Sequence, residues 1–389
     1  MRGILKNGSK KIVKKEKRKK YDSFDFTLFA TILILLGFGV VMVYSASFYK
    51  ATISESDGMY FFKRQAGFGV IGLLLMLFIS KVDYHKFKKL KWLRWLGLGV
   101  SATLLVITIL KIPGLTHSAY GATRWIKVPI IGQFQPSEIV KYAVILFVAI
   151  ELSRFGVRIK KFKGLWTTLI TVGFFAGLIY AQNSLSVAMI TAVVCGIMIF
   201  AAGADLRMIG GVAGLGIIGI LGIVNKPGFR SGRMATYFDP WSDPTDNGYQ
   251  IIQSFFALGS GGIFGLGLGE SRQKTMYLPE PHNDFIFAII GEELGLVGCL
   301  FVIALFILFV YRGIVIAITA KEVYGTLLAI GITGIIGIQA IMNIAVVTGA
   351  IPVTGVPLPF ISYGGTALVI NLCAMGVLLN ISRQCEREY

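Results

Sequence analysis

The sequence contains little charge and few residues that commonly bind metals. Only 15% of its 389 residues are Asp, Glu, Lys or Arg, whereas soluble domains carry about 25%. The three histidines lie far apart in the chain, and the four cysteines form no Cys-x-x-Cys pair. This composition argues against a soluble domain, a disulfide framework and a histidine or thiolate metal centre.

Acidic residues are scarcer than basic ones, and the basic excess is concentrated at the start of the chain. The net charge is +18, and ten of the first twenty residues are Lys or Arg. One interpretation is a tail that binds anionic lipids or a partner; a cytoplasmic tail that obeys the positive-inside rule is favoured. No aromatic residues alternate with these charges, so nucleic acid is not expected as a partner. We predict a basic cytoplasmic tail at 1–24 and no cleavable signal peptide.

Long apolar runs fill most of the remaining sequence, which is 55% hydrophobic overall. Apolar windows of roughly 20 residues predict membrane-spanning helices. We therefore expect an all-α, polytopic membrane domain over 25–389 with about ten spans. Because three spans in the middle of the chain are short, a total of nine or eleven spans also stays open. The expected spans are 25–48, 65–81, 92–111, 136–153, 164–181, 185–203, 207–224, 284–311, 323–348 and 361–381.

The distribution of Lys and Arg predicts the orientation of these spans. With the N-terminus inside, the cytoplasmic segments carry 26 of these residues and the external loops 11, as the positive-inside rule requires. Both termini are therefore expected in the cytoplasm, and the segments 112–135 and 225–283 are expected outside. Within the second, "YQIIQSFFALGSGGIFG" predicts an amphipathic or re-entrant segment at the outer membrane surface.

One stretch, "YLPEPHNDFIFAIIGEELG" at 277–295, places ionisable groups at the mouth of the eighth span. Ionisable groups at membrane depth are costly and mark a candidate functional site. Asp284 opens the span, and positions 288, 291 and 295 continue its helical face with Ala, Gly and Gly. That face suits either a groove for a lipid-linked substrate or close helix contact. An Asp at a helix start is also a common cap, so capping and catalysis both stay open.

Glu138 and Lys141 are i, i+3 neighbours about one turn inside the fourth span. Two interpretations fit this spacing: an ion pair that neutralises itself and serves packing, and a polar element that lines an outward-facing cavity. An isolated ion pair at this depth is costly, which favours the cavity. Cations in the expected external loops form a candidate pyrophosphate site. They are Arg124, next to Trp125, and Arg230, Arg233, Arg272 and Lys274.

A series of motifs, in order along the chain, resembles that of the SEDS family, the shape, elongation, division and sporulation proteins typified by FtsW, RodA and SpoVE. The resemblance covers nearly the whole chain from about residue 25, and "IGEELG" is closer to FtsW and SpoVE than to RodA. Two positions depart from the pattern: "QNSLS" at 182–186 replaces Gln/Glu-Pro-Asp-Leu-Gly-Thr, and Asn283 replaces a common Thr. The motifs are "GATRWI" (121–126), "QPSEIVKY" (135–142), "GYQIIQS" (248–254), "GGIFGLGLGESRQK" (261–274), the stretch 277–295 and "PVTGVPLPFISYGG" (352–365).

The resemblance implies a peptidoglycan glycosyltransferase that polymerises lipid II into β-1,4 glycan at the outer face of the bacterial cytoplasmic membrane, for division or sporulation. It implies that Asp284 is the essential aspartate. It also implies a class B penicillin-binding transpeptidase as partner, with other division or sporulation membrane proteins. Mg²⁺ or Mn²⁺ would assist, with Asp284 as a candidate ligand, and no organic cofactor is expected. A lipid II flippase and a non-enzymatic division scaffold remain alternatives. The candidate substrate-binding residues are Arg124, Trp125, Glu138, Lys141, Arg233, Gln253, Lys274, Glu280, His282 and Ser362.

Overall fold

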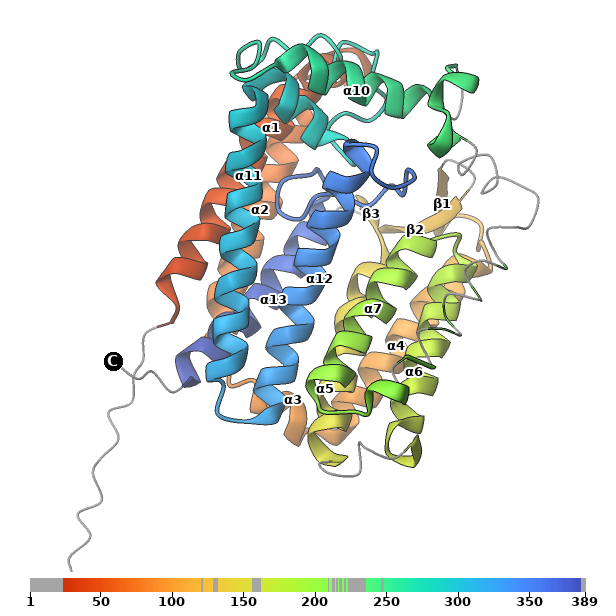
Figure 1. The fold of residues 1–389 in the computed structure, drawn as a ribbon, viewed down its shortest axis with the longest axis vertical. Coiled ribbons are helices and arrows are strands. Elements are labelled where there is room, and N and C mark those ends of the chain that lie inside the picture. The colour runs from red at the N-terminus through yellow and green to blue at the C-terminus, as the bar shows by residue number, and fades with distance from the viewer. Residues whose placement is uncertain are drawn as a thin grey trace, which may run out of the picture.

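The computed structural model is a bundle of long helices with a small sheet and a crossing helix at one end (Figure 1). It describes residues 24–119, 122–128, 132–155, 162–208, 236–245 and 248–385, together with 210, 211, 214, 216, 219 and 222. The helices with defined bounds are α1 (Phe26–Ser54), α2 (Tyr60–Ile79), α3 (His85–Lys89), α4 (Lys91–Ile109), α5 (Pro136–Phe155), α6 (Phe162–Ala181), α7 (Leu185–Ala201), α10 (Tyr249–Gly261), α11 (Ile286–Thr319), α12 (Val323–Val347) and α13 (Gly365–Gln384).

The predicted spans coincide with helices wherever the chain is described. Helices α1, α2, α6, α11, α12 and α13 are long and apolar enough to cross a membrane. The apolar stretches of α4 and α7 are shorter, and α5 carries two acidic and two basic side chains. The seventh expected span, 207–224, and the basic tail lie largely outside the described residues. The fold is that of a polytopic helical protein, and its exact number of spans stays a prediction.

The first and last helices are joined to each other at one end of the bundle. Asp25 precedes α1, and its carboxylate accepts a hydrogen bond from Leu28 N at 2.9 Å, so it caps that helix. Its backbone N–H donates to Ser382 Oγ near the end of α13 at 3.0 Å. Its carboxylate also pairs with Arg312 of α11. The start of α1 and the end of α13 therefore lie at the same end, as an even number of spans requires.

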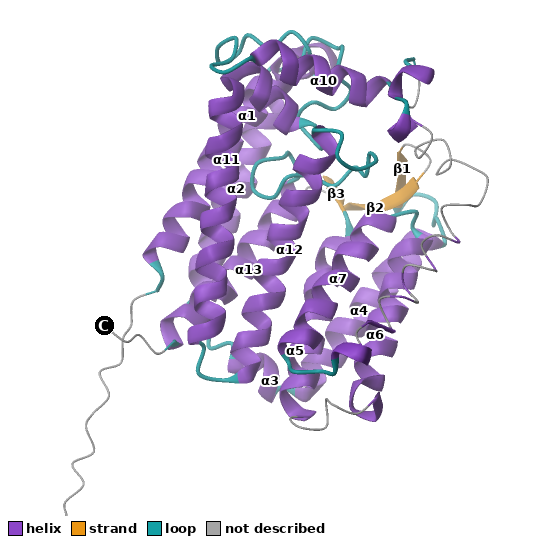
Figure 2. Ribbon diagram, viewed as in Figure 1, coloured by secondary structure: helices purple, strands orange, loops and turns teal. Residues whose placement is uncertain are grey.

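A three-stranded antiparallel sheet covers part of the opposite end, and the expectation of an all-α protein is wrong here (Figure 2). The strands are β1 (Thr116–Ala119), β2 (Ala122–Val128) and β3 (Gly132–Phe134), paired in that order. In this register His117 faces Trp125, and Ile126 faces Phe134. β-branched and aromatic residues favour strands, and β2 is rich in them. The sequence predicts the segment 112–135 only as an external loop, because its short strands show too little alternation to be recognised.

Helix α10 lies across the same end as the sheet (Figure 1). It is amphipathic, as the sequence predicted, with Ile251, Ile252 and Ala257 buried and Phe256 exposed. Its buried side packs on α11 and α12. The long segment between the seventh and eighth expected spans is therefore folded onto the bundle where it is described.

Helix α11 is interrupted at Gly295, which has φ +66° and ψ −163°. Only glycine adopts such angles without strain. The break frees backbone groups that the loop 262–267 satisfies. The carbonyl oxygens of residues 292 and 293 accept from the N–H groups of 266 and 267 at 2.9 and 3.0 Å, and the N–H groups of 296 and 297 donate to the carbonyls of 262 and 263. The loop is thereby fixed to the outer part of α11.

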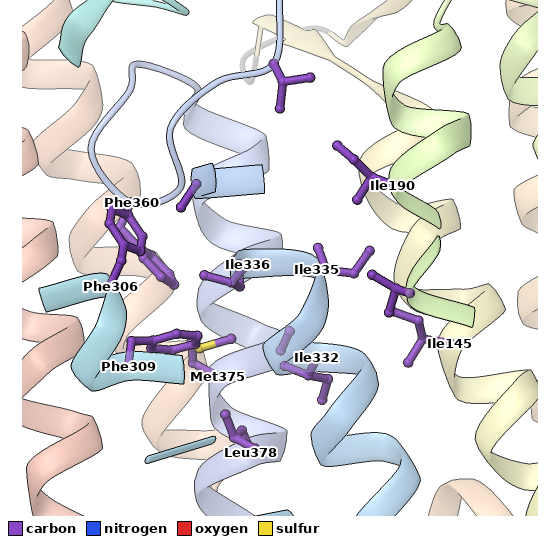
Figure 3. Packing of buried hydrophobic residues seen from close by; sticks show 14 of the residues in the cluster. Ile145, Ile190, Phe306, Phe309, Ile332, Ile335, Ile336, Phe360, Met375 and Leu378 are labelled. Atoms are coloured by element: carbon purple, nitrogen blue, oxygen red, sulfur yellow. The ribbon is translucent and has the colours of Figure 1, made fainter. Parts of the chain in front are cut away.

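The buried core is centred on α12, which lies between two groups of helices. Figure 3 shows Ile332 and Ile335 between Ile145 of α5 on one side and Phe309 of α11 and Met375 of α13 on the other. All five side chains are buried. Helix α12 thus contacts both halves of the bundle and can hold groups from both in a defined relative position.

We predict that the end bearing α10 faces outward. Ser242, in the short 3-10 helix η2 (Pro240–Ser242) just before α10, is exposed. A Ser242→Cys variant should react with a membrane-impermeant maleimide in intact cells. The matched variant Lys321→Cys, in the exposed turn between α11 and α12 at the other end, should react only after permeabilisation. The reverse pattern would invert the orientation.

Candidate active site

Asp284 lies directly before α11, at the end of the bundle that carries α10. The helix begins at Ile286 with Phe285 at the N-cap position. Asp284 therefore lies one residue before the N-cap and not at it. Its backbone carbonyl accepts a hydrogen bond from Asn343 Nδ2 of α12 at 2.6 Å. Its carboxylate faces the loop 352–364, because a Cβ placed on Gly355 would lie 3.4 Å from Asp284 Oδ2. Asp284 is half-buried.

The small-residue face below Asp284 is filled by protein, and of the two alternatives for it a substrate groove is not what the structure shows. A Cβ on Gly291 would lie 2.5 Å from Leu258 Cδ2 of α10, and one on Gly295 would lie 2.4 Å from Ile263 O. Ala288 has no exposed surface. The alternative stated for this pattern, close contact with a neighbouring segment, is the one the structure shows.

Glu280 and His282 lie in the turn before Asp284 and contact the first two helices. Glu280 accepts from Lys50 Nζ of α1 at 2.5 Å and from Asn283 Nδ2 at 2.8 Å. The His282 ring packs against Phe61 of α2, with ring centroids 4.5 Å apart. Burial lowers the pKa of His282 to about 4, which the Glu280 carboxylate only partly opposes. The imidazole is therefore neutral at pH 7 and contributes no charge toward an anionic substrate.

Glu138 and Lys141 form the expected pair, and the pair is fully enclosed. Lys141 Nζ donates to Glu138 Oε2 at 2.7 Å and to Gln339 Oε1 of α12 at 3.0 Å. The two side chains are 4% and 0% exposed. The adjoining cavity, lined also by residues 357–360 and 362–364, is about 20 Å³, which has room for about one water molecule. The structure supports the packing interpretation and not a role for Lys141 as a pyrophosphate clamp.

Lys274 is also engaged inside the protein. Its ammonium donates to Glu293 Oε1 at 2.7 Å, to Ser45 Oγ of α1 at 3.1 Å and to the carbonyl of Gly269 at 2.6 Å. These three contacts use all its donors. The neighbouring Glu292 accepts from Ser271 and from backbone N–H groups of the same loop. Lys274 thus neutralises a buried carboxylate, and its assignment as a pyrophosphate ligand is not supported.

Arg124 holds the turn between α6 and α7, the segment in which the sequence departs from its relatives. From β2 it donates to the carbonyls of Gln182 and Asn183. Ser186, at the start of α7, donates to Thr354 O at 3.4 Å. The 182–186 turn therefore links the sheet to the loop that faces Asp284. Trp125 is half-buried on β2.

The remaining candidates are dispersed. Ser362 closes a turn of the 352–364 loop, where its Oγ accepts from Leu358 N at 2.7 Å. Gln253 is half-buried on α10. Arg233 and Arg230 lie outside the described residues. Of the predicted residues, Glu280 and His282 lie in the turn just before Asp284. Ser362 lies in the same loop as Gly355, which faces Asp284.

Sequence reasoning missed several residues that build the site. Lys50 carries the cation opposite Glu280, and Gln65 of α2 donates to Ser362 O at 3.1 Å. Gln339 and Asn343 on α12 bind Lys141 and Asp284 respectively. One signal was present: two amides spaced i, i+4 in an otherwise apolar span lie on one helical face.

Protein ligands alone do not form a metal centre in the part of the chain that is described. No group of three His, Cys, Asp or Glu side chains converges there. Mg²⁺ is commonly held by one or two carboxylates together with substrate phosphates. Asp284 therefore fits such an ion only together with a phosphorylated substrate.

The fold, a bundle of long and largely apolar helices, places this protein in the class of polytopic helical proteins. The chain belongs to the FtsW/RodA/SpoVE family of cell cycle proteins, whose family model matches residues 26–387. It is 42% identical to the probable peptidoglycan glycosyltransferase FtsW of Geobacter sp. (strain M18), over 94% of this chain and 98% of the relative. It is 43% identical to stage V sporulation protein E of Bacillus subtilis (strain 168), with the same coverage.

Solved structures share the fold. A chain from a peptidoglycan synthase complex superposes with a TM-score of 0.74 at 24% identity, covering 93% of this chain and 98% of its own length. The rod shape determining protein RodA of Thermus thermophilus superposes with a TM-score of 0.68 at 22% identity, covering 94% and 99%. The arrangement of helices described above is therefore a multi-pass membrane fold.

Removing either member of the Glu138–Lys141 pair should destabilise the protein. Lys141→Met and Glu138→Gln each leave a buried polar or charged group uncompensated, at a cost of about 3–5 kcal/mol in free energy of unfolding. The double variant removes both charges and should recover most of that loss. Thermal unfolding in detergent measures it, with Lys321→Met at an exposed turn as control. A double variant as unstable as the single ones would contradict the packing role.

Lys274→Met should also destabilise the protein, because it leaves Glu293 buried beside Glu292 without a cation. We expect a loss of about 3–5 kcal/mol by the same measurement. Arg272→Met is the matched control: the Arg272 side chain is exposed, and only its backbone N–H contacts Glu292. A Lys274→Met protein with unchanged thermal stability would refute the neutralising role.

Proposed function

We infer that this protein is a peptidoglycan glycosyltransferase that polymerises lipid II into β-1,4 glycan strands at the outer face of the cytoplasmic membrane. The observation that carries this inference is the position of Asp284. Its half-buried carboxylate stands at the end of the bundle opposite the described termini, in a chain that is 42% identical to a probable peptidoglycan glycosyltransferase. The name of the second relative, a sporulation protein, supports a role in division or sporulation.

Asp284 acts as the general base. It accepts the proton from the 4-hydroxyl of the acceptor GlcNAc, whose oxygen forms a bond to the anomeric carbon of the donor sugar. The bond from that carbon to the donor pyrophosphate breaks, and undecaprenyl pyrophosphate leaves with the electron pair. Attack from the face opposite the leaving group inverts the α-linked donor and gives a β-1,4 linkage.

One carboxylate suffices for this reaction. A glycosidase needs a second carboxyl group to protonate a poor leaving oxygen, whereas pyrophosphate leaves readily once its charge is neutralised. Asp284 faces the 352–364 loop and keeps exposed surface.

The charge of the pyrophosphate would be met by cations other than the enclosed lysines. Arg124 is half-buried on β2 at the same end of the bundle, and Arg233 remains a candidate from the sequence. Mg²⁺ or Mn²⁺ would supply further neutralisation of the leaving group; binding of that ion, together with substrate oxygens, is the alternative role of Asp284.

The partner is a class B penicillin-binding transpeptidase that crosslinks the strands. A structural neighbour comes from a peptidoglycan synthase complex in which polymerisation and crosslinking are coordinated. The lipid-facing surface of α11, with Leu296, Leu300 and Ile307 exposed, offers apolar area for a partner's membrane helix. Both termini are cytoplasmic in this arrangement.

The decisive experiment replaces Asp284 by Asn. The amide keeps the size and hydrogen-bonding capacity of the side chain but cannot take up a proton. We expect polymerisation of purified lipid II, by the protein in complex with its transpeptidase, to fall by about 10²–10⁴-fold, with unchanged thermal stability and partner binding.

Asp57→Asn is the matched control, since it makes the same chemical change at an exposed site in the loop between α1 and α2. The Asp57 carboxylate pairs with the exposed Lys63 and accepts from Met59 N at 3.0 Å, and exposed pairs of this kind contribute little. An Asp284→Asn protein that makes glycan at the wild-type rate would remove Asp284 from the mechanism and the proposed function with it.

A further inference from the structure

Asn343 joins three parts of the site through one amide group. It stands on α12, and its side chain is 1% exposed. Its Nδ2 donates to the carbonyl of Asp284 at 2.6 Å and to the carbonyl of Val356 at 2.8 Å. The two N–H bonds of an amide diverge at a fixed angle in one plane, so the two carbonyls are held in a defined relative position.

The two carbonyls belong to the segments that face each other across the reactive carboxylate. Val356 follows Gly355, which lies against Asp284 Oδ2 and has φ +65°. Fixing Val356 O and Asp284 O to the same nitrogen therefore fixes the distance between the carboxylate and its opposing loop.

Gln339 extends this arrangement one turn along the helix. It lies i−4 from Asn343, about 6 Å along the axis and on the same face, and accepts from Lys141. The polar face of α12 thus contacts the Glu138–Lys141 pair of α5, the start of α11 and the 352–364 loop. One helix therefore fixes the positions of these three parts relative to one another.

The amide is retained at a cost in stability. Asn343 Oδ1 is buried and has no hydrogen-bond partner among the described residues, and a buried acceptor without a partner is unfavourable. An apolar residue at this position would remove that acceptor but would leave the carbonyls of Asp284 and Val356 without this donor. The donor end of this side chain is therefore what the position requires.

We propose that Asn343 is a positioning residue for the glycosyl transfer, which it serves by holding Asp284 at a fixed distance from the 352–358 segment. The proposal rests on the proposed role of Asp284 as the base. A misplacement of about 1 Å at a reacting group can lower a rate by about 10²-fold, so loss of the two hydrogen bonds acts on the chemical step and leaves substrate binding unchanged.

Two variants remove the donor with opposite effects on volume. Asn343→Leu fills the space, and Asn343→Ala leaves a small cavity. Both should lower kcat for lipid II polymerisation by about 10- to 100-fold with KM unchanged. Thr333→Val is the matched control, because Thr333 is another buried polar residue of α12 whose hydroxyl has no partner; its kcat should equal that of the wild type.

A double variant separates positioning from a general loss of structure. In the Asp284→Asn background, Asn343→Leu should cause no further loss of rate, because the group that it positions is already inactive. Wild-type kcat in both Asn343 variants would overturn the proposal, and so would an additive loss in the double variant. An Asp284→Asn protein with the wild-type rate would instead refute the proposed function itself, whatever the Asn343 variants do.

Discussion

Charged side chains inside the bundle must find their partners within the protein, because lipid offers neither hydrogen bonds nor counter-ions. Glu138 meets Lys141 on its own helix, and Glu293 meets Lys274 from the loop that precedes its helix. The second pair, with the backbone hydrogen bonds around Gly295, holds the loop 262–275 against α11. Neutralisation of buried charge thus also fixes a loop at the end of the bundle that carries α10.

Helix α12 relates these elements to the reactive carboxylate. Its apolar faces pack against both halves of the bundle, and one polar face carries Gln339 and Asn343 toward the site. The loop 352–364 leaves the end of this same helix and folds back over it. Asp284, although it precedes a different helix, contacts α12 through its backbone carbonyl and the returning loop through its side chain.

Features governed by local sequence were predictable. The apolar windows located the helices, and the i, i+3 spacing of Glu138 and Lys141 predicted a contact that one helix determines by itself. The position of Asp284 at the mouth of a span followed from the cost of charge in lipid. Each of these depends on neighbours within a turn or a single helix.

Features that depend on a distant segment were not predictable in the same way. Lys274 is an exposed-loop cation by sequence, and only the folded loop shows that its ammonium enters a pocket made by α1 and α11. The glycines below Asp284 looked equally suited to a groove or a contact, and α10 decides for contact. The short strands near Arg124 had too few residues to show a pattern. Asn343 was overlooked because a single amide carries no charge.

The interruption of α11 at Gly295 has a consequence for biogenesis. The chain leaves the translocon in sequence order, so in the proposed orientation the loop 262–275 emerges before α11 enters the bilayer. Lys274 and the backbone donors of that loop are then next to Glu292 and Glu293, and both carboxylates can be compensated before α12 and α13 are made. Glu138 and Lys141 satisfy the same condition within one turn. Each helix that carries charge here can be inserted together with what neutralises it, without waiting for the rest of the bundle to assemble.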